Sequence, residues 1–477
     1  MTEVVRSDEL GPWHPDIRGS FHYFVAGFRS LQDFDVTIKP GLNVLLGPNG
    51  SGKTNFIDFL DFITSLAHNN VPAAISAAGG ISRVFSQESL RRKIPRIRAK
   101  ICGLADIEPF IFDDTNRSRR YFNFEYELDV RYSKLHTSVY IANEKLKFKN
   151  LHSQEYPFDH NKTVGSVEIY RKGPTYEDEV RWKVGNYLIS NAPRNPLRHI
   201  HRHRMTSRML RERQTVNSFR EELLSEPPST APDESILSSR LAFPALDAVR
   251  GALSRSRSFN LNPNVAREPD DISKPPYIEP GGAGLYSTIY QMQQTARGLT
   301  KTRIPRKRFP KDALETIIAW TQIVIPDLSE ITATADPHTG KYLVYLHVNG
   351  ENGPLKIPLQ SASDGTLKWL AYVCLVVSQG SEYTFEEPEN YLHPKMQQFF
   401  VSLIRDSIDA SDEPSRFIVS THSETIINQC APQELVLFHF HKGETKSSRV
   451  SNSDSLIKQV NDTGFGLGYY YTMNVVR

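Results

Sequence analysis

The stretch GLNVLLGPNGSGKTNFIDFLDFITSL, residues 41–66, decides the fold. Its centre, residues 47–54, matches the pattern G-x-x-x-x-G-K-[ST], whose glycines let backbone N–H groups close around phosphates. An apolar, strand-like run precedes the pattern, and apolar residues recur at helical spacing after it. A phosphate-binding loop needs a strand before it and a helix after it, because the positive end of the helix adds to anion binding. The alternative, a glycine-rich turn without a ligand, does not account for this context.

The residues of this loop predict the contacts of a nucleotide. We expect Lys53 to reach the β and γ phosphates and the hydroxyl of Thr54 to bind Mg²⁺. The other residues of the loop that are expected to line the nucleotide are Asn49, Gly50, Ser51, Gly52 and Asn55.

A second anion-binding turn is predicted at SASDGTLK, residues 361–368, which leads into an apolar helical run. A hydroxyl and a glycine amide at a helix N-terminus can face a γ-phosphate, and here Ser363 and Gly365 would supply them. Asp364, between the two, is also expected to line the nucleotide. In the alternative interpretation, Ser363 or Asp364 simply caps the helix.

Two adjacent carboxylates, Glu386 and Glu387, follow the short strand-like run EYTF. In P-loop enzymes one acid at such a strand end orders Mg²⁺ and its water, which we assign to Glu386, while the next polarises the attacking water, which we assign to Glu387. His422, after the buried-type run RFIVS, can bring an imidazole to the γ-phosphate. The alternatives are a charged surface loop for the carboxylates and an ordinary loop residue for the histidine.

The composition excludes several classes of protein. Of the 477 residues 39% are hydrophobic, which is enough for a large core in one large or two to three ordinary domains. No run approaches the roughly 18 apolar residues of a membrane helix, and the N-terminus lacks the apolar core of a secretory signal. Cys102, Cys374 and Cys430 suggest neither a disulfide framework nor a zinc ribbon. A cytoplasmic protein that contacts no membrane is expected.

Basic residues are clustered although the net charge is only +3. Between Arg194 and Arg220 a predicted helical segment holds a single acid, Glu212, and eight arginines, at positions 194, 198, 202, 204, 208, 211, 213 and 220. A second basic run, LTKTRIPRKRFPK, lies near Arg306. The cluster from Arg194 to Arg220 predicts a DNA contact, with a solvated helix or a subunit interface as the alternative.

The pattern along the chain predicts an α/β protein in three parts. Residues 18–190 would form the N-terminal part of the head, with one strand over 21–28, a second over 34–46 and an antiparallel meander over 94–184. Residues 191–283 would form a helical, basic insertion that ends in a Pro/Gly/Asn-rich segment, over 256–284, that wraps the surface. Residues 284–477 alternate helical runs with the strand runs KYLVYLHV, EYTF, RFIVSTH and ELVLFHF, which favours a largely parallel central sheet.

Taken in order, GPNGSGKTN, SASDGT, EEPENYLHP and STHS resemble the Walker A, signature, Walker B with D-loop, and H-loop motifs of the ABC ATPases. The motif sequences are most similar to those of the RecF-like and overcoming-lysogenisation-defect branch, and the resemblance covers residues 21–83 and 284–440. This resemblance implies an ABC-type P-loop ATPase head with an antiparallel β-subdomain, binding ATP and Mg²⁺. It also implies a head-to-tail homodimer or higher oligomer, in which the Ser363 to Thr366 turn of one subunit closes over ATP held by Lys53 of another.

Two departures from the general family point away from transport. The signature reads SASDGT rather than S-G-G-Q, and Glu386 stands where an aspartate is usual. The branch implies two more contacts with the nucleotide or its metal ion: Gln87 as the Q-loop glutamine and Arg29 at the base or ribose.

The resemblance also bears on the activity. Relatives with the lysogenisation-defect architecture carry a C-terminal toprim nuclease, whereas only 47 residues follow Cys430 here, so ATP hydrolysis to ADP and phosphate without an intrinsic nuclease is expected. This leaves a similarity to stand-alone ATPase subunits of anti-phage systems such as PARIS and Septu, which act with a separately encoded effector nuclease.

Three functions compete at this point. The first is a sensor or scaffold ATPase of an anti-phage defence system that controls a separate effector. The second is a RecF-like DNA-binding ATPase in repair or recombination, and the third is the nucleotide-binding subunit of a transporter, for which neither a usual signature nor a membrane partner is in view.

Overall fold

The computed structural model describes most of the chain, with gaps. The described residues are 19–106, 121–150, 167–172, 181–184, 231–238, 244–254, 257–299, 309–351, 353–379, 382–411, 415–450 and 453–473. The arginine-rich segment 194–220 and most of the second basic run lie outside them, so the predicted DNA contact does too.

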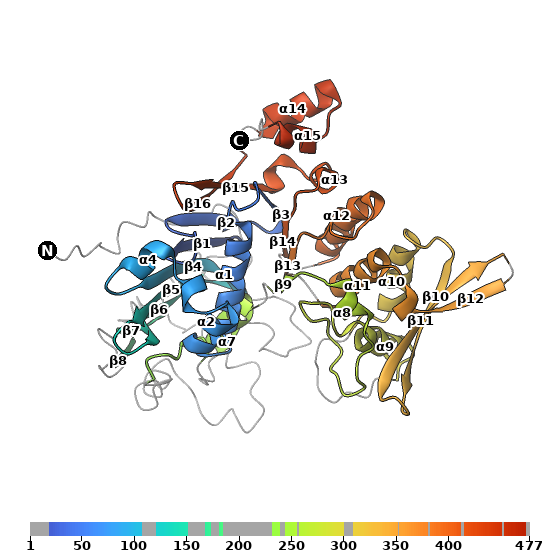
Figure 1. The fold of residues 1–477 in the computed structure, drawn as a ribbon, viewed down its shortest axis with the longest axis horizontal. Coiled ribbons are helices and arrows are strands. Elements are labelled where there is room, and N and C mark those ends of the chain that lie inside the picture. Colours follow the sequence, from blue (N-terminus) through green and yellow to red (C-terminus); the bar gives the residue numbers. More distant parts are fainter. Residues whose placement is uncertain are drawn as a thin grey trace, which may run out of the picture.

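A mostly parallel sheet lies at the centre of the molecule (Figure 1). Five of its strands run parallel, and the sixth returns antiparallel as a hairpin. The strand order is β16 (Glu444–Arg449), β15 (Leu435–His441), β3 (Gly41–Leu46), β14 (Arg416–Ser420), β13 (Glu382–Glu386) and β9 (Ser258–Phe259). Continuous apolar runs such as FIVS suit strands covered on both faces. The predicted α/β class with a largely parallel sheet is confirmed, and the strand of the phosphate loop lies inside it.

The second sheet is antiparallel and confirms the predicted meander. Its order is β2 (Phe34–Ile38), β1 (Phe21–Ala26), β4 (Arg96–Asp106), β5 (Tyr121–Ser133), β6 (Ser138–Asn150), β7 (Val167–Lys172) and β8 (Arg181–Val184). The prediction of a single strand over residues 34–46 is wrong, because that run supplies β2 here and β3 in the central sheet. Pro40 lacks a backbone N–H for a ladder and Gly41 has φ = 90°, so the chain turns between the two strands.

The helix after the phosphate loop, α1 (Lys53–Leu66), joins the two sheets. Its buried phenylalanines pack in one hydrophobic cluster with β1, β2 and β4, and Phe56 also meets Phe438 of β15. The same cluster includes residues of three other helices, α2 (Val71–Ala77), α3 (Ile81–Val84) and α7 (Pro244–Ser254). The loop at the start of α1 is therefore fixed by the core on both sides.

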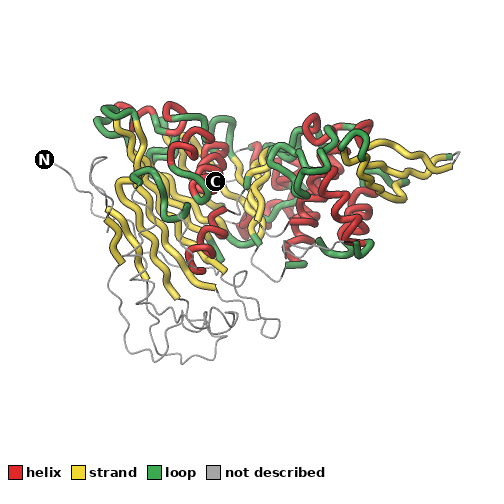
Figure 2. Tube along the Cα trace, turned by 90° about the horizontal axis from the view of Figure 1, so that it is seen from below, coloured by secondary structure: helices red, strands yellow, loops and turns green. Residues whose placement is uncertain are grey.

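A second hydrophobic cluster forms the other half of the molecule, where helices dominate (Figure 2). Its helices are α8 (Pro263–Arg267), α9 (Leu285–Ala296), α10 (Ala313–Gln322), α11 (Asp364–Gln379) and α12 (Pro394–Asp409). A three-stranded antiparallel sheet covers α9 and α10 and extends to the end of this half; it consists of β10 (Leu328–Asp336), β11 (Lys341–Gly350) and β12 (Gly353–Pro358).

Two predictions about this half are wrong. The run KYLVYLHV forms β11 of the small sheet and not a strand of the central one, because only alternate residues, Val344 and Leu346, are buried, as in a sheet with one covered face. The Pro/Gly/Asn-rich segment 256–284 does not simply wrap the surface, since Phe259, Leu261 and Ile278 are buried and β9 extends the central sheet.

The remaining described elements are short. They are α4 (Gln87–Arg91) beside the antiparallel sheet, α13 (Glu424–Ile427), α14 (Ser453–Thr463) and α15 (Leu467–Thr472) near the C-terminal end, and the 3₁₀ turns η4 (Leu359–Ser361) and η5 (Pro432–Glu434). Of the predicted helical insertion, the structure describes α7 and α8. None of the helices described is long and apolar enough to cross a membrane.

Candidate functional site

The phosphate-binding loop connects the centre of the parallel sheet to α1 in a form that requires its glycines. Gly50 and Gly52 have φ values of 79° and 100°, in the left-handed region that side chains avoid. A Cβ added to Gly47 would collide with the Phe438 carbonyl, and one added to Gly52 would collide with Thr445. The loop is therefore packed under the β15–β16 hairpin.

Lys53 is buried at the centre of this loop, with 6% of its surface exposed. Its Nζ lies 2.7 Å from the Gly47 carbonyl oxygen, 3.3 Å from that of Pro48 and 3.0 Å from His422 Nε2. Burial lowers the pKa of the ammonium, while the charges of Glu387, Glu389 and Glu386 raise it. These contacts hold a cation against the loop, where phosphate oxygens are stronger acceptors than carbonyls.

Ser51 and Thr54 provide a test of whether the loop fits a nucleotide with its metal ion. Ser51 is 2% exposed and its Oγ has no partner among the described residues, so a buried hydroxyl is left for a bound group. The Thr54 Oγ1 donates to Glu386 Oε1 at 2.8 Å, joining the first turn of α1 to the end of β13. A hydroxyl and a carboxylate are oxygen ligands of the kind Mg²⁺ takes beside phosphates. The residues present fit Mg²⁺ and a triphosphate.

Glu387 begins the loop after β13 with a strained backbone. Its φ is 44°, which is uncommon for a residue with a side chain, and its N–H donates to the Ser420 carbonyl at 2.9 Å. Asn390 Nδ2 donates to Glu387 Oε2 at 3.1 Å. The carboxylate is thus oriented by two hydrogen bonds: one from the Glu387 backbone to the end of the neighbouring strand, and one from the Asn390 amide to the carboxylate itself.

His422 follows β14 and meets the phosphate loop. Burial and the neighbouring Lys53 charge lower the pKa of the imidazole. An ammonium only donates, so the neutral ring accepts from Lys53 at Nε2. The His422 N–H donates to Glu389 Oε1 at 2.7 Å, which ties this strand end to the loop after β13.

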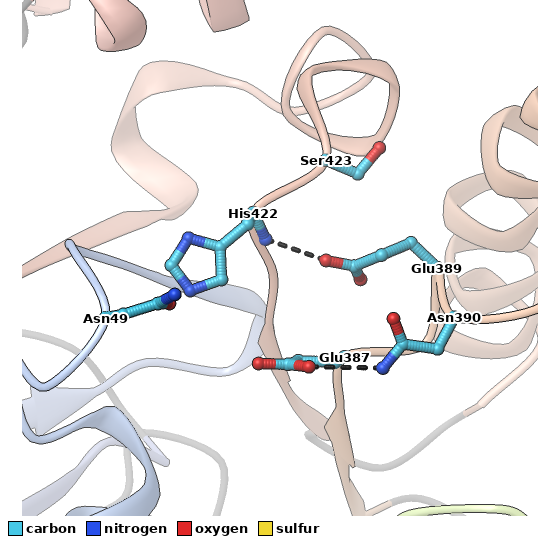
Figure 3. A pocket seen from close by; sticks show the side chains of 6 residues that line it. All are labelled: Asn49, Glu387, Glu389, Asn390, His422 and Ser423. Atoms are coloured by element: carbon cyan, nitrogen blue, oxygen red, sulfur yellow. Dashed lines mark hydrogen bonds between the residues drawn. The ribbon is translucent and has the colours of Figure 1, made fainter.

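Glu387 and His422 line a pocket of about 550 Å³ (Figure 3). Its walls come from the phosphate loop, the loop after β13 and the turn after β14: Asn49, Glu387, Glu389, Asn390, His422 and Ser423. Three of them were not predicted from the sequence, namely Glu389, Asn390 and Ser423. Glu389 and Asn390 stand within the EEPEN motif and Ser423 within THS, so motif membership was a usable signal for all three.

The residues of the signature turn are not among those that line this pocket. The Ser363 Oγ accepts the Thr366 N–H at 3.2 Å, so Ser363 does cap α11, as the alternative interpretation has it. A Cβ on Gly365 would lie 2.8 Å from the Tyr391 carbonyl oxygen, so the turn packs closely against the end of the loop after β13. Asp364 pairs with Arg267.

The other predicted contacts with the nucleotide are engaged elsewhere. Arg29 pairs with Asp58 of α1 and donates to the Ala78 carbonyl at 3.0 Å, and burial together with Arg83 lowers its pKa. Asn55 Nδ2 donates to Ser30 Oγ at 2.6 Å. Gln87 is an exposed residue at the start of α4 and is not among the pocket residues. The structure therefore brings together Asn49, the Lys53 and Thr54 pair, Glu386, Glu387 and His422, but not Arg29, Gln87 or the signature turn.

Comparison with known proteins places the chain in a family. A sequence profile described as "AAA domain, putative AbiEii toxin, Type IV TA system" matches residues 42–428. The chain belongs to this AAA-domain family. With the motif order and the fold described above, it is a P-loop ATPase of the ABC type.

Shorter similarities connect this AAA-domain protein to DNA replication and repair protein RecF. The chain is 38% identical to RecF of Renibacterium salmoninarum over 65 residues, which are 14% of this chain and 15% of the relative. It is 40% identical to RecF of Frankia alni over 52 residues, 11% of this chain and 14% of the relative. The matches thus span a small part of each relative's length.

Among solved structures, the Smc head bound to the C-winged helix domain of ScpA covers 92% of this chain and 99% of that chain, with 14% identity and a TM-score of 0.44. The SMC head domain from Thermotoga maritima covers 91% and 99%, with 9% identity and a TM-score of 0.35.

Proposed function

We propose that this AAA-domain protein binds and hydrolyses ATP at the pocket between the phosphate loop and the ends of β13 and β14. The observation that carries the proposal is the convergence of three strand ends: Lys53 contacts His422, and Thr54 contacts Glu386, in one site. Groups from residues 53, 386 and 422 are far apart in the chain, so their meeting reflects the tertiary fold.

Each residue has a role in this proposal. Lys53 and the loop N–H groups bind the phosphates, and Thr54 and Glu386 would hold Mg²⁺, which neutralises charge on the phosphates when bound. Glu387 accepts a proton from the attacking water, and Asn390 keeps its carboxylate oriented. The neutral imidazole of His422 is held by Glu389 through its backbone and can donate to the γ-phosphate after a change of tautomer.

The site requires a second subunit in this proposal. The signature turn of the same chain packs against Tyr391 and does not line the pocket. Two copies arranged head to tail would place the turn of one chain over the triphosphate of the other, giving two equal composite sites. The division of the head into residues 18–190 and 284–477 around an insertion at 191–283 belongs to the same proposal.

The biological output that we propose is a conformational signal. The protein acts as a cytoplasmic sensor or scaffold ATPase of an anti-phage defence system, similar to the PARIS and Septu subunits, and controls a separately encoded effector nuclease. The family description, which names a toxin and a type IV TA system, supports a role in such systems.

The RecF similarity favours a second candidate, a DNA-binding ATPase in repair or recombination, with residues 194–220 on the phosphate backbone. Electrostatic binding of this kind weakens steeply with salt. Filter binding with and without ATP at two salt concentrations separates the candidates: salt-sensitive DNA binding supports the second, and its absence together with co-purification of a neighbouring gene's product supports the first.

Two measurements on the Glu387→Gln variant test the ATPase proposal: phosphate release, which measures turnover, and light scattering, which detects the dimer. Removal of the proton acceptor should lower turnover by about 100-fold or more and trap an ATP-dependent dimer. Glu88→Gln, at an exposed ion pair on α4, is the matched control and should keep full turnover. A Glu387→Gln protein with unchanged turnover would contradict the assignment of the base.

A further inference from the structure

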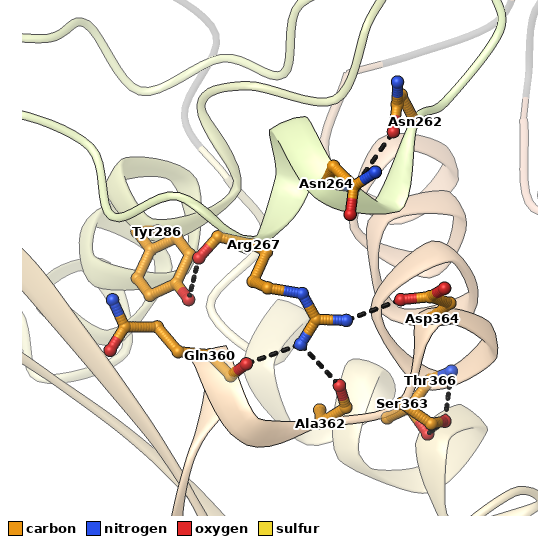
Figure 4. Close-up of polar contacts among 9 residues, drawn as sticks. All are labelled: Asn262, Asn264, Arg267, Tyr286, Gln360, Ala362, Ser363, Asp364 and Thr366. Carbon is orange, nitrogen blue, oxygen red and sulfur yellow. Dashed lines mark hydrogen bonds and ion pairs between the residues drawn. The ribbon is translucent and has the colours of Figure 1, made fainter.

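The signature turn is anchored by a residue that belongs to none of the motifs. Arg267 is the last residue of α8, a short helix that starts at Pro263 and is capped by Asn262, whose side chain accepts the Asn264 N–H. In Figure 4 the Arg267 side chain extends from this helix to the backbone of residues 360–364. More than ninety residues separate the two in the chain.

The guanidinium of Arg267 makes three contacts with the turn. Nη1 donates to the carbonyl oxygen of Gln360 and to that of Ala362, the latter at 2.8 Å, and Nη2 pairs with Asp364 Oδ1. A planar guanidinium offers several donors in a fixed geometry, so one side chain sets the positions of two carbonyls and one carboxylate at once. Arg267 thus contacts the backbone before Ser363 and the side chain of the residue after it.

Arg267 is itself held by the core. Its carbonyl oxygen accepts the Tyr286 hydroxyl at 2.9 Å, and Tyr286 is 1% exposed. The Arg267 side chain is 29% exposed and the Asp364 side chain is 47% exposed. The turn is therefore anchored to a buried residue, while the ion pair that holds it remains partly exposed to a ligand.

The charge of Asp364 makes the pairing important for an anion. Asp364 stands at the N-terminus of α11, where a carboxylate stabilises the helix but competes with any phosphate that approaches the same amides. Among the described residues Arg267 is the cation that pairs with it. Without Arg267 the turn would present an uncompensated negative charge next to Ser363.

We propose that Arg267 is the positioning residue that makes the signature turn competent to bind the triphosphate held by a second copy. It does so by fixing the Gln360 and Ala362 carbonyls and by neutralising Asp364. This inference rests on the proposed function, because the ligand of the turn is the ATP of the composite site. It assigns a role in closing the dimer, not in the chemistry at Lys53 and Glu387.

The test uses the full chain with Glu387→Gln as the parent, and four derivatives: Arg267→Ala, Arg267→Lys, Asp364→Asn, and Arg267→Ala combined with Asp364→Asn. The control is Arg92→Ala, which removes an arginine from an exposed ion pair on the antiparallel half. ATP-dependent self-association is measured by sedimentation. Binding of a fluorescent ATP analogue at protein concentrations below dimerisation reports on the Lys53 site, and thermal unfolding reports on folding.

Arg267→Ala should weaken self-association about tenfold or more while changing ATP binding by the monomer less than about twofold. Adding Asp364→Asn should recover part of the loss, about threefold, because the unpaired charge is gone. The self-association of Arg267→Lys should lie between that of the parent and that of Arg267→Ala, because lysine keeps the charge but lacks the several planar donors of a guanidinium. A purely structural role would predict no recovery on removing Asp364.

Three outcomes overturn the inference or a part of it. If the parent self-associates with ATP and Arg267→Ala does so equally well, Arg267 has no positioning role and the proposed function stands. If the combined variant is no better than Arg267→Ala, neutralisation of Asp364 is excluded. A parent that shows no ATP-dependent association would overturn the composite site and this inference together.

Discussion

The pocket at the phosphate loop and the turn at residues 361–366 are built in opposite ways. In the pocket, motif residues contact one another: Lys53 meets His422, and Thr54 meets Glu386. At the turn, the motif is held from outside by Arg267, and Ser363 is engaged only within its own helix start. In our proposal the pocket binds phosphates within one chain, whereas the turn contacts the triphosphate of a second copy.

The largest effect should come from Lys53→Ala, which removes a phosphate contact from the pocket at the phosphate loop. Loss of the buried ammonium should weaken ATP binding about 100-fold or more, because no other cation donates directly within the loop among the described residues. Calorimetry with ATP and Mg²⁺ measures it. Lys395→Ala, at an exposed position on α12, serves as the control. Tight ATP binding by the Lys53→Ala variant would show that the loop amides suffice to bind the phosphates, and would contradict the role assigned to Lys53.

A mixture of two inactive variants tests directly whether the turn of one copy completes the ATP site of another. Lys53→Ala lacks the phosphate contact and Ser363→Arg blocks the turn, so each homodimer should be inactive. In a head-to-tail heterodimer one of the two sites contains both intact partners, so an equal mixture should recover about a quarter of the wild-type ATPase activity. Phosphate release assays read this out. No recovery, with mixed dimers shown to form, would contradict a site completed in trans.

The pH dependence sharpens the role of His422 in the pocket. The folded-state pKa of His422 is lowered, so the neutral ring and its contribution are fully present above the ordinary histidine value of about 6.5 and are lost as the pH falls through the lowered value. A charged ring would face Lys53, while Glu387 and Glu389 oppose the shift. Turnover should therefore decline only as the pH falls through this lowered pKa, on the acidic side of about 6.5. The His422→Gln variant should lack this decline of turnover at low pH, whereas a variant of the exposed His439, His439→Gln, should keep it. If the decline persists in His422→Gln, another group causes it.

The smallest effect should come from Asn390→Ala. This change removes the amide that orients Glu387 but leaves the bond between the Glu387 N–H and Ser420, so we expect turnover to fall about threefold to tenfold with ATP affinity unchanged. Asn390→Asp should be worse than Asn390→Ala, because it places a second carboxylate beside Glu387. Equal activity in all three proteins would show that the backbone alone aims the carboxylate.

Several features were predictable because they are written in local sequence. The glycines and Lys53 of the loop, the carboxylates at the end of β13 and the histidine after β14 each stand at the junction of an apolar run and a polar turn. Such junctions are strand ends, and parallel strand ends gather at one edge of a sheet. The fold class and three of the pocket residues, Asn49, Glu387 and His422, followed from this.

Other features depended on which surfaces meet. Residues 342–348 have the alternating pattern of a strand, yet pattern alone did not say that they pair with β10 and β12 rather than enter the central sheet. Gln87 and Arg29 were placed by resemblance, and the structure engages Arg29 with Asp58 instead of leaving it at the pocket.

The sequence by itself thus determined a phosphate loop, its acids and its histidine, because their spacing from buried runs is a local property. Only the tertiary structure decided that the 361–366 turn is fixed by Arg267, since that contact joins segments more than ninety residues apart and leaves no periodic signal. For the same reason the separation of the turn from the pocket, which makes a second copy necessary in our proposal, became visible only in three dimensions.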